Sequence, residues 1–218
     1  MILEKHLYLK ENGCFSDTLI GADLDILKSI YERTLNLEFT NSCHTGYLSG
    51  YSNNLSFNEL VEIKNKTLKQ NKEETNVMQY WYFNPSIVFT EDEKAFISFI
   101  CRKIVTDLYP DEVSNLYSNP LHTSLTMFDK GCFIINHADG GSGMNLCNIL
   151  FYVNNSYKEG YGGELVVNDS IVINPEFGRY AVIDFYYSNP THRVNEILDD
   201  TFQRKAFITS LPIIQTDK

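Results

Sequence analysis

The sequence predicts a mainly β protein with flanking helices, in which two packed sheets form a sandwich or jelly roll. Two observations predict this fold class. The second half of the 218-residue chain contains six short runs rich in β-branched and aromatic residues, with turn-forming residues between them. These runs do not alternate with helical segments, as the strands of a βαβ fold would. Helical patterns lie in the first half instead, so we expect helices to pack on the outside of the β core.

The expected strands are short runs, and each ends at a turn signal. In chain order they are LTMFD, CFIINH, LCNILFYVN, GGELVVN, YAVIDFY and KAFITSL. We expect residues 1–218 to form a single domain, with the jelly-roll core in residues 121–214 and a mainly helical region in residues 1–120. Within that first region, residues 38–58 are polar and predict a long surface loop, and residues 57–72 predict a helix.

Two further segments of the first half have the periodicity of amphipathic helices. The first spans residues 20–35. In the second, TEDEKAFISFICRKIVTDLYP, Thr90 and Glu93 form a capping box and Pro110 ends the helix. The expected buried faces are Leu24, Leu27, Ile30 and Tyr31 in the first helix, and Ile97, Ile100, Cys101, Ile104 and Leu108 in the second.

Composition excludes several classes of partner. A net charge of −10, without a lysine or arginine cluster, argues against nucleic acid or an anionic membrane. The five cysteines are scattered, odd in number and without a CxxC pair, so we expect Cys132 and Cys147 to be buried, reduced strand thiols. The N-terminal stretch lacks the apolar core of a signal peptide, and apolar runs are too short to span a membrane. A cytoplasmic location is the expectation, and the oligomeric state stays open.

Two side chains that can bind metal, His137 and Asp139, directly follow the apolar run FIIN. Residues i and i+2 of a strand point to the same side, so both can face one cavity. His192, in SNPTHRV, is the third candidate, because an imidazole after a strand and a proline turn has no evident packing role. Two histidines and one carboxylate form the facial triad of non-haem Fe(II) oxygenases. Surface His-x-Asp pairs without metal are also common. The remaining histidines, expected to be structural or exposed, are His6, His44 and His122.

Arg204 opens the last expected strand, RKAFITSL, shortly after His192. If its side chain enters the β core, an unpaired guanidinium costs roughly several kcal/mol and needs an anion there. No carboxylate is clearly placed in the sequence to be that partner. A dicarboxylate cosubstrate would match the guanidinium in a bidentate fork. The alternative is that Arg204, like Lys205, is exposed at the start of the strand.

Taken in order, HxD, YGGEL, THRV and an arginine that opens the last strand resemble the prolyl-4-hydroxylase-like Fe(II)/2-oxoglutarate dioxygenases. The matching stretches are FDKGCFIINHAD, CNILFYVNNSYKEGYGGELVVN, GRYAVIDF, THRV and RKAFITSL, which cover roughly residues 122–213. Each motif alone is weak, but their order and spacing together are specific. The resemblance implies a double-stranded β-helix, or jelly roll, with N-terminal helices outside it. Residues 1–120 would also supply the lid and the substrate wall.

The resemblance implies roles for individual residues. The iron ligands of the family correspond to His137, Asp139 and His192. Arg204 matches the basic residue that binds the distal carboxylate of 2-oxoglutarate, and Tyr152 matches a tyrosine that donates its hydroxyl to the same carboxylate. Leu150, two residues before Tyr152, would face the same cavity. The implied cofactors are Fe(II), 2-oxoglutarate as cosubstrate and O2, with ascorbate as a candidate reductant.

Some positions qualify this resemblance. Phe128 stands where many relatives have a tyrosine near the cosubstrate, so one hydrogen bond of the family is missing or replaced. Asp139 is retained, which favours hydroxylation over the halogenation of relatives that have a small residue there. Gly162 and Gly163 lie at a turn before a strand, where glycine permits a tight conformation.

The implied activity is hydroxylation of an unactivated C–H bond in a prolyl, amino-acid or small peptide-like substrate, with release of succinate and CO2. A cupin-like zinc or manganese metalloenzyme on the same fold is an alternative, and a non-catalytic binding module is another. Arg204 and Tyr152 disfavour the first, since a hydrolase needs no dicarboxylate clamp, and the intact ligand set disfavours the second. Arg193 either supports the neighbouring ligand or anchors a substrate carboxylate. The aromatic cluster 80–83 belongs either to the substrate wall or to the core.

Overall fold

A computed structural model describes residues 2–35, 40–44, 79–84, 90–110, 122–139, 145–154 and 156–212. For the strands β2 (Thr40–His44) and β3 (Gln79–Asn84) it describes only the backbone. The described helices are α1 (Ile2–Asn12), α2 (Ala22–Thr34) and α4 (Glu91–Leu108). The other described strands are β1 (Cys14–Thr18), β4 (His122–Phe128), β5 (Phe133–His137), β6 (Asn145–Tyr152), β7 (Leu165–Val167), β8 (Ile171–Ile173), β9 (Arg179–Asp184), β10 (His192–Val194) and β11 (Arg204–Pro212).

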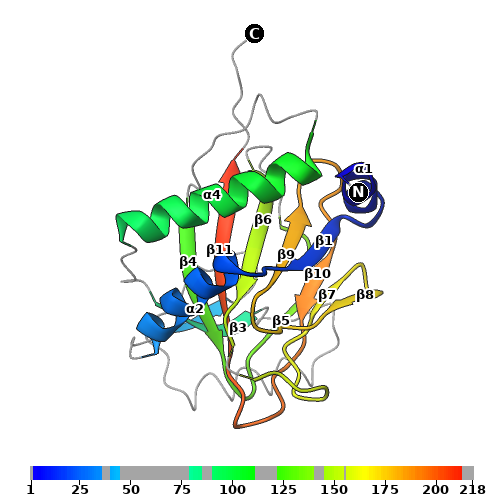
Figure 1. The fold of residues 1–218 in the computed structure, drawn as a ribbon. Coiled ribbons are helices and arrows are strands. Elements are labelled where there is room, and N and C mark those ends of the chain that lie inside the picture. The colour runs from blue at the N-terminus through cyan, green and yellow to red at the C-terminus, as the bar shows by residue number, and fades with distance from the viewer. Residues whose placement is uncertain are drawn as a thin grey trace.

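The strands form two antiparallel sheets that meet at β3 (Figure 1). The larger sheet has the order β1-β9-β6-β11-β4, and the smaller one has the order β5-β10-β7-β8. β3 pairs with β4 through Tyr82–Asn84 and with β5 through Gln79–Tyr80, so it leads from one sheet into the other. This arrangement confirms the expected jelly-roll core with helices outside it.

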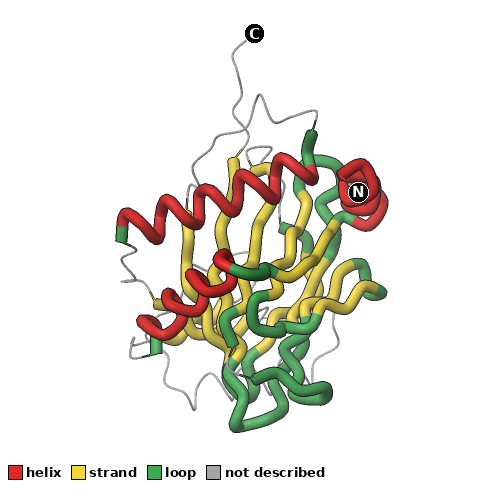
Figure 2. The backbone as a smooth tube through the Cα atoms, in the orientation of Figure 1, coloured by secondary structure: helices red, strands yellow, loops and turns green. Residues whose placement is uncertain are grey.

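Successive side chains along each strand of the larger sheet point alternately to its two faces. Ile149 and Phe151 of β6 belong to the buried cluster that the helices cover, together with Phe207 of β11. Leu150 and Tyr152 point the opposite way, into an interior cluster between the sheets. Figures 1 and 2 show α4 and α2 lying across the outer face of this sheet. The inner face is therefore free to carry a functional site.

The two clearest helix predictions are confirmed. In α4 the Thr90 hydroxyl accepts a hydrogen bond from the Glu93 backbone N–H at 3.2 Å, and the Glu93 carboxylate accepts one from the Thr90 N–H at 2.7 Å. Every residue of the predicted apolar stripe is buried, and the helix ends just before Pro110. In α2, Leu27 and Ile30 are buried, with Leu24 and Tyr31 packed at the edge of the same cluster.

Several elements differ from the sequence-based expectation. α1 and β1 were not expected, because the apolar residues of α1 do not share one face: Leu9 is buried beside the polar His6, whereas Leu3 and Leu7 are exposed. The expected surface loop over residues 38–58 is wrong for β2, whose backbone pairs with β3. The polar composition of β2 hid this long-range pairing. The helix expected over residues 57–72 lies outside the described residues.

Cysteine and histidine side chains mostly behave as expected. The described cysteines, Cys14, Cys101, Cys132 and Cys147, are all free and buried. Cys147 lies in β6 as expected, whereas Cys132 lies one residue before β5 and not within a strand. His6 has a structural role, because its Nδ1 lies 2.7 Å from the carbonyl oxygen of Leu108 and joins α1 to the end of α4. No helix in the described part of the chain is long and apolar enough to cross a membrane.

Candidate active site

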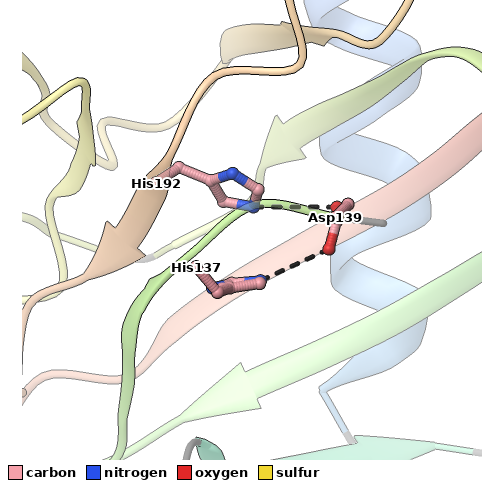
Figure 3. Close-up of side chains that lie close together, drawn as sticks. All are labelled: His137, Asp139 and His192. Carbon is pink, nitrogen blue, oxygen red and sulfur yellow. Dashed lines mark ion pairs between the residues drawn. The ribbon is translucent and has the colours of Figure 1, made fainter. Parts of the chain in front are cut away.

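The pairing of β5 with β10 brings two histidines together. His137 is the last residue of β5, His192 is the first of β10, and the two are direct cross-strand partners. Their ring centroids lie 4.4 Å apart. Asp139 follows β5 by two residues and turns back toward both rings (Figure 3). Its Oδ1 lies 3.3 Å from the Nε2 of His137, and its Oδ2 lies 3.7 Å from the Nε2 of His192.

The backbone determines which nitrogen of each imidazole faces this centre. His137 Nδ1 lies 2.9 Å from the carbonyl oxygen of Ile135, and His192 Nδ1 lies 3.2 Å from that of Pro190. A carbonyl oxygen only accepts, so each Nδ1 carries the proton and donates it. In a neutral imidazole the other nitrogen, Nε2, then presents a lone pair. Both lone pairs converge on a carboxylate, and this arrangement is stabilised either by a cation between the three groups or by a proton on the imidazole of His137.

The pKa shifts agree with a site that attracts positive charge. Burial raises the pKa of the Asp139 carboxyl, but the hydrogen bond with His137 and the charges of both imidazoles outweigh it, so the pKa falls below its usual value. Burial lowers the pKa of His137, but its contacts with Asp139 outweigh burial and raise it. Burial and the neighbouring His137 lower the pKa of His192. The carboxylate is thus ionised at neutral pH, and His192 is neutral.

The three side chains fit a divalent metal ion. Their ligand atoms all lie within 4.8 Å of one another, and no other such group of three His, Cys, Asp or Glu was found among the described residues. Two imidazole nitrogens and one carboxylate oxygen suit Fe(II) as well as Zn²⁺ and Mn²⁺. Since only three ligands come from the described chain, an octahedral ion would retain open positions for other molecules.

Arg204 is buried between the sheets, so the alternative in which Arg204, like Lys205, is exposed at the start of the strand is wrong. Its side chain is 1% exposed, and even its neighbour Lys205 is only 7% exposed. The guanidinium carbon lies 4.7 Å from the centre of the Phe128 ring and 5.1 Å from that of Tyr152. Nη2 lies 3.5 Å from the hydroxyl oxygen of Tyr152. The aromatic rings therefore hold this cation from two sides through cation–π contacts.

This guanidinium lacks an anion in the part of the chain that the structure describes. No described carboxylate forms an ion pair with Arg204, and its buried Nε has no hydrogen-bond partner there. The Tyr152 side chain is fully buried; burial raises its pKa, while Arg204 works in the opposite direction, so the phenol keeps its proton. A buried cation beside a hydroxyl donor is suited to bind a carboxylate group.

The inner face of β6 runs between the two ends of the site. Asn148, Leu150 and Tyr152 alternate along this face. The amide of Asn148 contacts Asp139 at one end, and Tyr152 contacts Arg204 at the other. Leu150 lies between them, is 5% exposed and belongs to the apolar cluster between the sheets. The sequence did not single out Asn148, because an asparagine within an apolar strand carries no recognisable motif.

Gly163 is required by close packing against the buried arginine. Its φ is +83°, and a β-carbon there would lie 2.5 Å from Ile197 Cδ1 and 3.1 Å from Arg204 Cδ. Gly162 has a similar φ of +80° and would clash with the backbone of Glu196. The structural role expected of both glycines is consistent with this packing, and Gly163 also adjoins the site.

Arg193 points away from the metal-binding side chains. It neighbours His192 on β10, so its side chain lies on the opposite face of the strand. There it forms an ion pair with Asp169 and a hydrogen bond with Asn195 at 3.3 Å. The described contacts of Arg193 therefore lie on the outer face of the smaller sheet, where they link β10 to neighbouring segments. The side chains of the aromatic cluster 80–83, and the loop after Asp139, lie outside what the structure describes.

Solved structures match this fold over nearly the whole chain. A prolyl-4-hydroxylase from Pseudomonas putida matches with a TM-score of 0.61, over 98% of this chain and 99% of its own, at 11% identity. A prolyl hydroxylase from Trichoplax adhaerens, in complex with a hypoxia inducible factor peptide fragment, matches with a TM-score of 0.59 at 13% identity. That match covers 97% of this chain and 89% of the other. The fold is that of the 2-oxoglutarate/Fe(II) oxygenases.

The 2-oxoglutarate/Fe(II) oxygenase fold supports more than one reaction. SnoN, a non-haem α-ketoglutarate-dependent epimerase from nogalamycin biosynthesis, matches with a TM-score of 0.59 over 97% of this chain and 83% of its own, at 9% identity. At such low identities the likeness establishes the fold and not the reaction. No family model matches the chain, and no curated protein matches it. The similarity to prolyl-4-hydroxylases expected from the motifs is thus confirmed at the level of fold.

Proposed function

We propose that this protein is an Fe(II)- and 2-oxoglutarate-dependent oxygenase. The proposed reaction hydroxylates an unactivated C–H bond in a prolyl, amino-acid or small peptide-like substrate, and releases succinate and CO2. The observation that carries this proposal is the buried Arg204, which has no anion among the described residues and lies in the same interior as a His-Asp-His group. A metal site alone fits many reactions, whereas a metal site with a buried carboxylate receptor fits few.

Each residue has a distinct role in this proposal. The metal ligands are His137, Asp139 and His192. Arg204 and Tyr152 bind the distal carboxylate of 2-oxoglutarate, the first through its charge and the second through its hydroxyl. Leu150 excludes water beside the cosubstrate. When bound, Fe(II) and 2-oxoglutarate supply the oxidising chemistry that uses O2, while ascorbate is the proposed reductant that keeps the metal ferrous.

The choice of substrate class rests on similarity. The matching structures from Pseudomonas putida and Trichoplax adhaerens carry the names of prolyl hydroxylases, and the second is a complex with a peptide. The negative charge of the chain, −10, favours a neutral or cationic substrate over an anionic one. The alternative reaction is an epimerisation, in which the substrate gains no oxygen, because one matching structure is an epimerase.

A cupin-like zinc or manganese enzyme is the second candidate, because the same three ligands suit those ions. The pair of Arg204 and Tyr152 disfavours it, since hydrolysis at such a metal needs no buried carboxylate receptor. A non-catalytic binding module is disfavoured by the convergence of all three ligand atoms within 4.8 Å.

Anaerobic titration tests the proposal directly. Purified protein with Fe(II) is titrated with 2-oxoglutarate while the metal-to-ligand charge-transfer absorbance is followed, and succinate release is then measured in air with amino acids and proline peptides. A saturable absorbance band and substrate-stimulated succinate are the expected results. Absence of the band, together with hydrolytic activity that depends on Zn²⁺ or Mn²⁺, would establish the second candidate instead.

A further inference from the structure

Asp139 is the least restrained member of the metal-binding group. Its side chain is 41% exposed, whereas those of His137 and His192 are 13% and 8% exposed. Each histidine is oriented by a hydrogen bond to a backbone carbonyl of its own chain segment. Asp139 instead follows the end of β5, and lies beyond its ladder of backbone pairing. A carboxylate in this position needs an additional contact if it is to keep one orientation.

Asn148 supplies such a contact from the facing strand. Its Nδ2 donates to Oδ2 of Asp139 at 3.5 Å, a long hydrogen bond. The other carboxylate oxygen, Oδ1, is the one nearer to the Nε2 of His137. The two oxygens of Asp139 therefore differ: each faces one imidazole, Oδ1 that of His137 at 3.3 Å and Oδ2 that of His192 at 3.7 Å, but only Oδ2 also has an amide donor beside it.

The carboxylate of Asp139 determines which way the amide of Asn148 faces, and Ser210 binds the other end of that amide. Ser210 on β11 is the cross-strand partner of Asn148, and its hydroxyl donates to Oδ1 of Asn148 at 2.7 Å. The reversed amide would direct its oxygen at an acceptor-only carboxylate, and two acceptors repel each other. The chain of donors therefore runs in one direction, from the Ser210 hydroxyl to Asn148, and from Asn148 to Asp139.

We propose that Asn148 is a positioning residue that holds Oδ2 of Asp139 and leaves Oδ1 as the metal-binding oxygen, while Ser210 anchors its amide from the neighbouring strand. This inference rests on the proposed metal site and deepens it. Outer hydrogen bonds that orient a metal ligand typically change metal affinity about 10- to 100-fold when they are removed. Because the contact is long, we expect a loss near the lower end of that range.

A purely structural role for Asn148 makes a different prediction. Asparagine in a strand interior would then only satisfy Ser210, and its replacement would change stability but not metal affinity. Thr209 provides the matched control, because it neighbours Ser210 on β11 and is fully buried on the opposite face. Its hydroxyl lies 3.1 Å from that of Thr123, on the face of β11 opposite to Ser210. Thr209→Val removes a hydroxyl from the same strand without touching the proposed relay.

Cobalt titration distinguishes these roles. Co²⁺ is added to the purified full chain under anaerobic conditions, and both the dissociation constant and the visible absorbance spectrum are measured with the unfolding temperature. We expect Asn148→Leu to weaken Co²⁺ binding about tenfold and to change the spectrum, and Ser210→Ala to weaken it by a few fold. Thr209→Val should alter the unfolding temperature while its affinity and spectrum match those of the parent.

The possible outcomes separate this inference from the proposed function. If Asn148→Leu binds Co²⁺ as tightly as the parent with the same spectrum, the positioning role is wrong while the metal site stands. Equal losses in Asn148→Leu and Thr209→Val would also overturn it, because the effect would then be general destabilisation. A parent protein that fails to bind Co²⁺ would overturn both the metal site and the role of Asn148.

Discussion

The imidazoles of His137 and His192 lie directly opposite each other on β5 and β10, with ring centroids 4.4 Å apart. Each ring donates its Nδ1 proton to the carbonyl oxygen of the residue two positions before it. Local backbone thus orients both rings, and only the pairing of the strands brings them together. The resulting pair of Nε2 lone pairs, with Asp139 between them, is a site prepared for a cation before any metal binds.

Replacing the metal-binding side chains should abolish metal binding without unfolding the protein. His137→Ala, Asp139→Ala and His192→Ala each remove one of three ligands at or just beyond the ends of strands, and none of the three belongs to a hydrophobic core cluster. The measurement is Fe(II) or Co²⁺ affinity, with circular dichroism as a check of the fold. His6→Ala is the matched control, because His6 is 5% exposed and His192 is 6% exposed. It should lower stability by about 1–3 kcal/mol and leave metal affinity unchanged; normal affinity in all three triad variants would contradict the assignment.

Removing the charge of Arg204 should weaken the binding of 2-oxoglutarate and leave metal binding unchanged. A charge-assisted bidentate contact is worth about 1.5–3 kcal/mol, so Arg204→Met should lower cosubstrate affinity on the order of ten- to several-hundred-fold. Arg204→Lys should be intermediate, and Tyr152→Phe should cost less. The charge-transfer titration measures each variant. Because the guanidinium lacks a described anion, Arg204→Met should not lose stability as a broken ion pair would.

A second arginine serves as the control for this prediction. Arg193 is 33% exposed and pairs with Asp169 on the outer face of β10. Arg193→Met should therefore leave 2-oxoglutarate affinity unchanged. If Arg193→Met lowered the affinity for 2-oxoglutarate and Arg204→Met did not, the site that binds its distal carboxylate would lie elsewhere than proposed.

Adding a methyl group at Gly163 should displace the side chain of Arg204, which packs against this glycine. The new β-carbon would clash with Ile197 and press on Arg204, and a φ of +83° strains any other residue. Gly163→Ala should destabilise the fold by about 1–3 kcal/mol and also lower 2-oxoglutarate affinity. Gly160→Ala has a similar φ of +89° but meets nothing within 4 Å. It should show the backbone strain alone, with normal cosubstrate affinity; equal binding in both variants would refute the packing argument.

The capping box of α4 should produce a pH-dependent contribution to stability. Partial burial raises the pKa of Glu93, but hydrogen bonds from Arg33 and Thr90 outweigh it, so the pKa falls below its ordinary value of 4.5. The ionised form is thus favoured in the folded state, and its contribution is present above about pH 5 and is lost as the pH falls through the lowered folded pKa. Thr90→Ala should cost about 1 kcal/mol at pH 7.

Urea unfolding of the parent and of Glu93→Gln, at neutral pH and near pH 3, measures this contribution. The parent should be the more stable at neutral pH, by roughly 0.5–1 kcal/mol, and the difference should shrink in acid. A difference that stays constant with pH would show that the charge of Glu93 contributes nothing. Metal and cosubstrate affinity should be the same in both proteins, since α4 packs on the outer face of the sheet.

The sequence predicted those features whose signals are local. The run LCNILFYVN, rich in apolar and aromatic residues and bounded by turn residues, identified β6, and the spacing of Thr90 and Glu93 identified the start of α4. The HxD motif with a later histidine indicated a metal site, because these residue types have little other reason to follow apolar strands. Polar β2 and amphipathically irregular α1 escaped prediction, since their stability comes from partners far away in the chain.

The tertiary structure decided which of these residues meet, and in which direction they point. Strand periodicity states that Arg204 and Lys205 face opposite sides, but not which one enters the interior between the sheets. The pairing of β11 with β4 and β6 placed Arg204 between Phe128 and Tyr152, and the same pairing set Ser210 opposite Asn148. A local pattern specifies period and capping, whereas register depends on contacts between residues separated by dozens of positions. Long-range pairing therefore turned a set of motifs into one site.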